Sequence, residues 1–203
     1  AAYAARYEQA VAAVERRESE LDAGGARRLS KLVARNLFKV MAYKDEYEVA
    51  RLHADPAFRA QIAASFEGDY QLAFHLAPPL LARSKPGSIV PRKVRLGGWM
   101  MPVFGALARC KSLRGGPLDV FGYTAERRRE RALRDRYLAF ADMLAHSLRA
   151  DNMAAALALA QLPDGGRGYG HVKLAALDRF DAEWERQLAA YRGGQAVELR
   201  RRA

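Results

Sequence analysis

Apolar residues recur at helical spacing along most of the chain. In the first segment, Tyr3 to about Asp22, apolar side chains three to seven positions apart alternate with charged ones, which predicts an amphipathic helix. The pair Gly24-Gly25 favours an end to this helix.

The next segment carries apolar residues on two sides. With successive residues 100° apart, one face from about Arg27 to Ala54 collects Leu29, Leu32, Val33, Asn36, Val40, Tyr43, Tyr47, Ala50 and Ala54. The opposite face holds Phe38, Met41, Val49 and Leu52. This pattern predicts one long helix running through the middle of the fold.

The period then changes. Asp55-Pro56 predicts the cap and first turn of a helix with Phe58, Ile62 and Phe66 one turn apart, ending at Gly68. Strict alternation over residues 70–76 and again over 90–96 predicts two short antiparallel strands, a ribbon inserted at about 69–97.

The second half returns to helical spacing. A short helix is expected near Met101 to Leu113, and Thr124 is placed to cap a long one. Its stripe comprises Leu133, Tyr137, Phe140, Leu144 and Leu148. Asp151 is expected to cap a further helix through Leu162. A last helix has apolar residues at Leu174, Leu177, Phe180, Trp184, Leu188 and Tyr191.

Composition supports this interpretation, because Ile occurs only at positions 62 and 89 and Thr only at 124. A shortage of β-branched residues favours helix. We therefore expect a mainly α fold: a single helical domain over residues 1–192 around the long central helix, with a two-stranded antiparallel β ribbon. Residues 193–203 are expected to form a flexible basic tail.

Apolar runs stop well short of the roughly 20 residues that a membrane span needs, so no membrane-spanning segment is expected. The first residues lack an initiating Met and a signal-peptide pattern, which indicates a piece of a longer polypeptide. The one cysteine, Cys110, excludes an internal disulfide and fits a reducing cytoplasm.

The formal net charge of +11 raises the question of an acidic partner or nucleic acid. Arginines crowd the first turns of the helix after Thr124, at positions 127, 128, 129 and 131, where they oppose the helix dipole. Their positive charge would be offset by an acidic neighbour such as Glu126 or Glu130, or by a partner. No nucleic-acid-binding motif accompanies the charge, so a solvated basic surface is the better interpretation and a nucleic-acid partner is not expected.

The sequence contains no recognisable catalytic or metal-binding pattern. The four histidines, His53, His75, His146 and His171, show no paired metal-ligand spacing, and the serines lack nucleophile-elbow surroundings. The glycine-rich stretch Asp164 to Lys173 could expose backbone N–H groups to an anion beside Arg167 and Lys173. It lacks the spacing of a phosphate loop, so a helix–helix turn is the better interpretation.

Lys44, Glu48 and Arg51 lie at i, i+4 and i+7 of the predicted central helix, so their charges could pair along one flank. We interpret them as structural, because partly buried charges need partners.

Four strings, in order, carry a family resemblance: RNLFKVMAYKDEYEVARL at 35–52, FEGDYQLAFHLAPPLLA at 66–82, FGYTAERRRERAL at 121–133 and RGYGHVK at 167–173. Together they resemble the C-terminal domain of the fused indolepyruvate:ferredoxin oxidoreductases, a branch of the 2-oxoacid:ferredoxin oxidoreductases. The resemblance covers nearly the whole chain.

The resemblance implies a parent enzyme that oxidatively decarboxylates an aryl pyruvate to its acyl-CoA. Such an enzyme uses thiamine diphosphate with magnesium and passes electrons through iron–sulfur clusters to ferredoxin. Its cofactor domains lie N-terminal to the part seen here, and the full-length enzyme is expected to be a homo-oligomer.

No catalytic, cofactor-binding or metal-binding residue is therefore assigned to this chain, which lacks a thiamine-diphosphate motif and the cysteines of a cluster. We expect it to pack on the catalytic body without being active alone. Nine residues are candidates for an interface or structural role: Lys44, Glu48, Arg51, Tyr123, Arg127, Arg128, Arg167, His171 and Lys173. The alternative is a basic docking module for ferredoxin, coenzyme A or nucleic acid.

Overall fold

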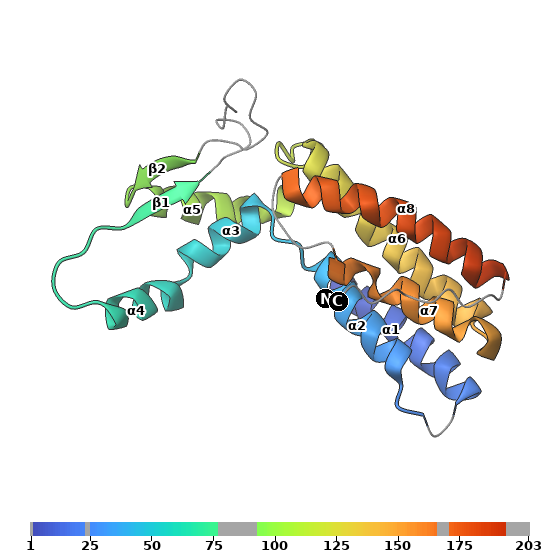
Figure 1. The fold of residues 1–203 in the computed structure, drawn as a ribbon. Coiled ribbons are helices and arrows are strands. Elements are labelled where there is room, and N and C mark those ends of the chain that lie inside the picture. The colour runs from blue at the N-terminus through green and yellow to red at the C-terminus, as the bar shows by residue number, and fades with distance from the viewer. Residues whose placement is uncertain (1, 23–24, 77–92, 166–170, 194–203) are drawn as a thin grey trace, which may run out of the picture. The chain divides into compact units, whose positions relative to one another are not determined.

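A computed structural model describes residues 2–22, 25–76, 93–165 and 171–193, with the backbone alone for 171–179. In these ranges the chain forms eight α-helices and one two-stranded antiparallel sheet. The predicted mainly α fold with a β ribbon is confirmed (Figure 1). The predicted basic tail lies almost wholly outside the described residues.

The chain divides into two compact units. Unit 1 combines Ala1–Tyr43 with Glu130–Ala203, and unit 2 is Lys44–Arg129. The single domain over residues 1–192 stays a prediction.

Unit 1 is a helix bundle. It contains α1 (Ala2–Leu21), α2 (Arg28–Met41), most of α6 (Ala125–Ser147), α7 (Met153–Gln161) and α8 (His171–Gly193). Short 3₁₀ turns at Ala150–Asn152 and Leu162–Gly165 flank α7. In Figure 1, α7 lies beside α2 and beside α8, which agrees with their packing contacts.

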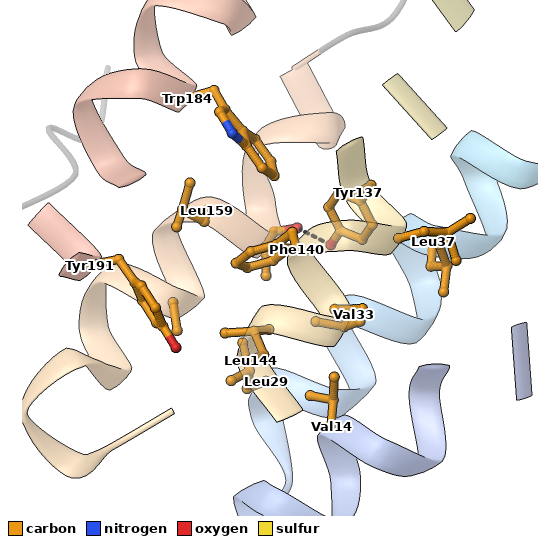
Figure 2. Close-up of a cluster of buried hydrophobic side chains, with 14 of the residues drawn as sticks. Val14, Leu29, Val33, Leu37, Tyr137, Phe140, Leu144, Leu159, Trp184 and Tyr191 are labelled. Atoms are coloured by element: carbon orange, nitrogen blue, oxygen red, sulfur yellow. Dashed lines mark hydrogen bonds between the residues drawn. The ribbon is translucent and has the colours of Figure 1, made fainter. Parts of the chain in front are cut away.

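The predicted stripe of α6 forms the centre of the unit 1 core. Tyr137, Phe140, Leu144 and Leu148 are buried and Leu133 is half-buried, as predicted. They pack with side chains from the other four helices, including Val14, Leu29, Val33, Leu37, Leu159, Trp184 and Tyr191 (Figure 2). Tyr137 donates its hydroxyl to the Ala160 carbonyl at 2.8 Å, so the one polar atom of this ring is satisfied inside the core.

The start of α2 is held by a carboxylate from α1. Arg27, before the helix, has φ 50° and offers no side-chain cap. Instead Glu18, which is 6% exposed, accepts hydrogen bonds from the backbone N–H groups of Leu29 (2.9 Å) and Ser30 (2.8 Å). A negative charge at a helix N-terminus satisfies free N–H groups and complements the helix dipole. The contact therefore fixes α1 against α2.

The predicted long helix over Arg27 to Ala54 is wrong in its continuity. It ends at Met41, and α3 (Glu46–Ala54) begins after a break over residues 42–45. Asp45 causes the restart, because its side chain accepts the Glu48 N–H as an N-cap and its extended backbone cannot continue a helix. The break also lies at the boundary between the two units.

The predicted second apolar face is only partly buried. Met41 is buried and Val49 and Leu52 are half-buried, but Phe38 is 62% exposed. Neither helix is therefore covered on both sides along its whole length.

Unit 2 contains α3, α4 (Pro56–Ser65), β1 (Ala73–Leu76), β2 (Val94–Gly97), α5 (Met100–Arg109) and a 3₁₀ turn at Cys110–Leu113. As predicted, Asp55 caps α4 by accepting the Ala57 N–H, with Pro56 in the first turn. The strands pair antiparallel with Phe74 opposite Leu96, and Phe74 is buried while His75 is exposed. The predicted ribbon is confirmed where it is described; residues 77–92 lie outside that range.

Two predicted caps in the second half have different outcomes. Thr124 accepts the Arg127 N–H at 3.3 Å and so caps α6 as predicted. Asp151 does not cap α7; it lies in the preceding 3₁₀ turn and pairs with Arg149. The neighbouring Asn152 accepts the Arg149 N–H and donates to the Ser147 carbonyl. An amide can do both, which a carboxylate cannot.

Candidate functional site

Buried carboxylates in unit 2 organise the segment from Cys110 to Tyr123. Asp119 is 4% exposed. It accepts hydrogen bonds from the backbone N–H of Gly115 at 2.8 Å, from the backbone N–H of Gly122 at 3.0 Å and from the Tyr47 hydroxyl at 3.2 Å. One side chain thus closes a loop on itself and ties it to α3.

Tyr47 packs against this loop with its ring buried. Its ring is 2% exposed and meets Phe121 edge-on at 5.4 Å between centroids. Burial, together with the Asp119 carboxylate, raises the pKa of Tyr47 to about 12. The hydroxyl therefore stays protonated and donates to Asp119 throughout the physiological range.

Asp45 attaches the other end of the loop. Besides capping α3, its carboxylate binds the Arg114 guanidinium, with Nη2 to Oδ1 at 2.8 Å and Nε to Oδ2 at 2.5 Å. Such two-point contacts fix direction as well as distance. The sequence analysis missed both Asp45 and Asp119. An Asp directly before a helix is a signal for the cap at Asp45, and the turn sequence Gly115-Gly116-Pro117 close to Asp119 is a signal for the loop.

The predicted charge ladder forms only in part. Arg51 donates to both Glu48 oxygens, at 3.1 and 3.0 Å from Nε and 2.7 Å from Nη2. These bonds hold the pKa of Glu48 below its usual range. Lys44 lies in the break before α3, exposed, so the predicted pairing along one helix flank does not include it.

The predicted arginine cluster is not a uniform patch. Arg127 pairs with Glu46 of α3 at 3.3 Å, and both side chains are less than one-fifth exposed. This adds an acidic neighbour that sequence reasoning, which named Glu126 and Glu130, did not find. Arg128 is exposed. Within the cluster, Arg127 therefore attaches the start of α6 to α3, whereas Arg128 lies on the surface of unit 2.

Tyr123 stands outward at the end of the loop. It is 61% exposed, and its hydroxyl donates to the Pro117 carbonyl at 2.9 Å. The same loop exposes Leu118 (70%) and Val120 (56%). Of the other candidate residues, Arg167 lies outside the described residues, and His171 and Lys173 are in the first turn of α8 without described side chains.

His53 lies in an aromatic cluster rather than in a ligand set. It stacks on Phe104 at 5.0 Å and meets Phe58 and Phe74 edge-on at 5.3 Å each. Burial lowers its pKa. Across the described part of the chain no three His, Cys, Asp or Glu side chains gather as a metal site would require.

An open hollow of about 600 Å³ lies at the end of the ribbon. Its lining includes Tyr70, Gln71, Arg95 and the pair Gly97-Gly98. Tyr70, Gln71 and Arg95 are exposed, so the hollow is a shallow surface feature rather than an enclosed ligand site.

Among the helices described, none combines the length and apolar character needed to span a membrane. The searches of curated proteins and of solved structures each found no match. A family of unknown function, DUF6537, matches residues 1–186. Since the match covers most of the 203 residues, the chain belongs to the DUF6537 family.

Proposed function

We propose that this chain is a non-catalytic supporting domain of an indolepyruvate-type 2-oxoacid:ferredoxin oxidoreductase. The parent enzyme would oxidatively decarboxylate aryl pyruvates to acyl-CoA in the cytoplasm and reduce ferredoxin. The observation that carries the proposal is the set of four strings, which occur in one order between residues 35 and 173.

The side chains present do not fit the cofactors of such an enzyme. An iron–sulfur cluster takes several thiolate ligands, and the whole sequence has one cysteine, Cys110. The sequence also lacks a thiamine-diphosphate motif. Thiamine diphosphate, magnesium and the clusters would therefore be held by the N-terminal catalytic domains of the parent enzyme, and no reaction step is assigned to this chain.

The candidate charged residues support a structural role. Glu48 is engaged by Arg51, Glu46 by Arg127 and Asp45 by Arg114. The hydrogen bonds from Arg51 hold the pKa of Glu48 below its usual range, so this carboxylate is a poor proton acceptor at neutral pH. These pairs position α3, the loop that begins at Arg114 and the start of α6 within unit 2, which is a structural role.

The codons upstream of Ala1 test the proposal. A thiamine-diphosphate module encoded in the same reading frame supports it, particularly if the purified parent enzyme reduces ferredoxin with indolepyruvate and coenzyme A. A start codon immediately before Ala1, or a parent without that module, refutes it.

A second candidate is a basic docking module for ferredoxin, for the phosphates of coenzyme A or for nucleic acid. The exposed cations Lys44 and Arg128 and the net charge of +11 favour it, whereas the engagement of Arg127 by Glu46 weakens it. Electrostatic binding weakens steeply with salt. Titration of the chain with ferredoxin, coenzyme A and duplex DNA at low ionic strength tests it, and the absence of binding to all three excludes it.

A further inference from the structure

Apolar side chains are distributed very unequally between the two units. Among the described residues, 4 of the 25 buried hydrophobic residues belong to unit 2, but so do 8 of the 11 large hydrophobic residues that are exposed. A unit with a small core and several exposed large apolar side chains is typical of a domain whose surface another molecule covers. We therefore expect an interface on unit 2.

Residues 114–123, which we call the docking loop, form the most exposed apolar part of unit 2. Leu118, Val120 and Tyr123 are 70%, 56% and 61% exposed. Three large apolar side chains within ten residues remain mostly in water, so the favourable free energy of burying them is not realised in the chain alone. A contact with a partner would recover that free energy.

The loop is preorganised. Asp119 bonds the backbone N–H groups of Gly115 and Gly122, Arg114 is fixed on Asp45, and the Tyr123 hydroxyl is tied to the Pro117 carbonyl. Gly115 has φ +74°, which allows the tight turn at the start of the loop. A loop held in one conformation loses little entropy on binding, which favours docking into a surface of fixed shape.

The charge around the loop indicates the chemistry of the partner. Residues 109–128 contain five basic side chains (Arg109, Lys111, Arg114, Arg127 and Arg128) and two acidic ones (Asp119 and Glu126), a net charge of 5 − 2 = +3. Arg114 and Arg127 pair with Asp45 and Glu46, which lie outside this segment. The exposed charge of the segment therefore comes from Arg109, Lys111 and Arg128, beside the half-buried Glu126, and remains basic. An apolar surface bordered by cations is complementary to an apolar hollow bordered by carboxylates.

We propose that the docking loop binds such a carboxylate-rimmed apolar hollow on the catalytic domains of the parent enzyme, with Leu118, Val120 and Tyr123 as its contacts. The identity of the partner rests on the proposed function. A basic apolar loop could also meet an anionic membrane. The fixed backbone and the tied Tyr123 hydroxyl favour a protein surface, because a partner of fixed shape can complement a single loop conformation, whereas a fluid bilayer adapts to any shape.

Hydroxyl-radical footprinting tests the assignment on the 203-residue chain and on the intact parent enzyme. We expect the oxidation of Leu118 and Tyr123 to be about fivefold slower in the parent, because interface cores exclude water. Phe38 of unit 1 is the matched reference, since it is 62% exposed and Tyr123 is 61% exposed. Its oxidation should change by less than about twofold, as expected for a side chain outside such a core.

Variants of the parent enzyme sharpen the test. Val120→Asp should abolish the protection of Tyr123, whereas Val103→Asp, on α5 of the same unit and 43% exposed, should leave it unchanged. Unchanged oxidation of the loop in an active parent enzyme, or equal protection of Phe38, would overturn the docking loop while leaving the proposed function standing. A parent without thiamine-diphosphate-dependent turnover would overturn the proposed function instead.

Vesicles of phosphatidylserine and phosphatidylcholine test the membrane reading. We expect the 203-residue chain to show no protection of Leu118 or Tyr123 when such vesicles are added. Protection by vesicles that Val120→Asp removes would overturn the assignment to a protein partner.

Discussion

Replacing Asp119 by Ala should release the loop between Gly115 and Gly122. The carboxylate is 4% exposed and satisfies two backbone N–H groups and the Tyr47 hydroxyl. A buried polar group left without a partner costs about 1–3 kcal/mol. Since the Gly115 N–H is only partly buried and water can reach it, we expect the substitution to cost about 3–5 kcal/mol in local stability.

Hydrogen exchange of the Gly115 and Gly122 amides, measured by NMR, reports this loss directly. Local opening made easier by about 3 kcal/mol raises an exchange rate roughly a hundredfold. Asp69→Ala, which removes an exposed carboxylate from the same unit, is the control and should change stability by less than about 0.5 kcal/mol.

The substitution Asp119→Asn tests the roles of the two carboxylate oxygens separately. Oδ1 accepts from Gly122 and Tyr47, whereas Oδ2 accepts from Gly115. An amide keeps one acceptor oxygen and places N–H donors at the other position. We therefore expect the Gly115 amide to exchange faster while the Gly122 amide stays protected. Exchange within about twofold of the native rate at both amides in Asp119→Ala would refute the role given to this side chain.

Four further predictions concern titration and packing. Absorbance at 295 nm should assign a pKa of about 12 to Tyr47 by difference from Tyr47→Phe, and Asp119→Ala should lower it; a value near 10 would contradict the described burial. Burial lowers the pKa of His53, so the native state favours the neutral ring, and its contribution to stability is complete above about pH 6.5 and lost as the pH falls through the lowered pKa. Exchange at α3 should therefore rise between pH 7 and pH 5, after correction for the intrinsic rate, and His53→Gln should abolish the rise. Leu144→Ala, at a site 0% exposed in the unit 1 core, should cost about 2–5 kcal/mol in urea unfolding, and a cost under about 1 kcal/mol would mean that the core is not packed as described. Arg51→Ala should leave the urea unfolding midpoint nearly unchanged, because its pairs with Glu48 and Asp55 lie at the surface, and a clear loss of stability would point to a partner beyond these two carboxylates.

Periodicity was a good guide wherever burial is one-sided and continuous. The α6 stripe from Leu133 to Leu148 was predicted because a 3.6-residue repeat survives over more than four turns. The ribbon could be predicted because apolar and polar residues alternate along it, and the buried Phe74 and exposed His75 follow that alternation.

The same reasoning missed the break between α2 and α3. Tyr47 and Ala50 are buried and still fit the register of Val33 and Val40, so the apolar pattern carries through the break. What ends the helix is a local competition in which Asp45 caps α3 and binds Arg114, and hydrophobic spacing does not record such a competition.

The site could be predicted only in part. The Glu48–Arg51 pair lies within one helix, so its spacing shows in the sequence. The contacts of Asp119 with Tyr47 and of Arg127 with Glu46 join residues 72 and 81 positions apart. A single sequence carries no signal for contacts over such distances, because they depend on how the elements pack.

We propose that this chain supports an enzyme whose cofactors are held by other domains. The most direct measurement is turnover of indolepyruvate by the purified 203-residue chain, supplied with coenzyme A, thiamine diphosphate, magnesium and oxidised ferredoxin. We expect no ferredoxin reduction by the chain, alongside reduction by the parent enzyme under the same conditions. Reduction by the chain alone, or thiamine diphosphate bound stoichiometrically to it, would show that the chain is itself catalytic or cofactor-binding.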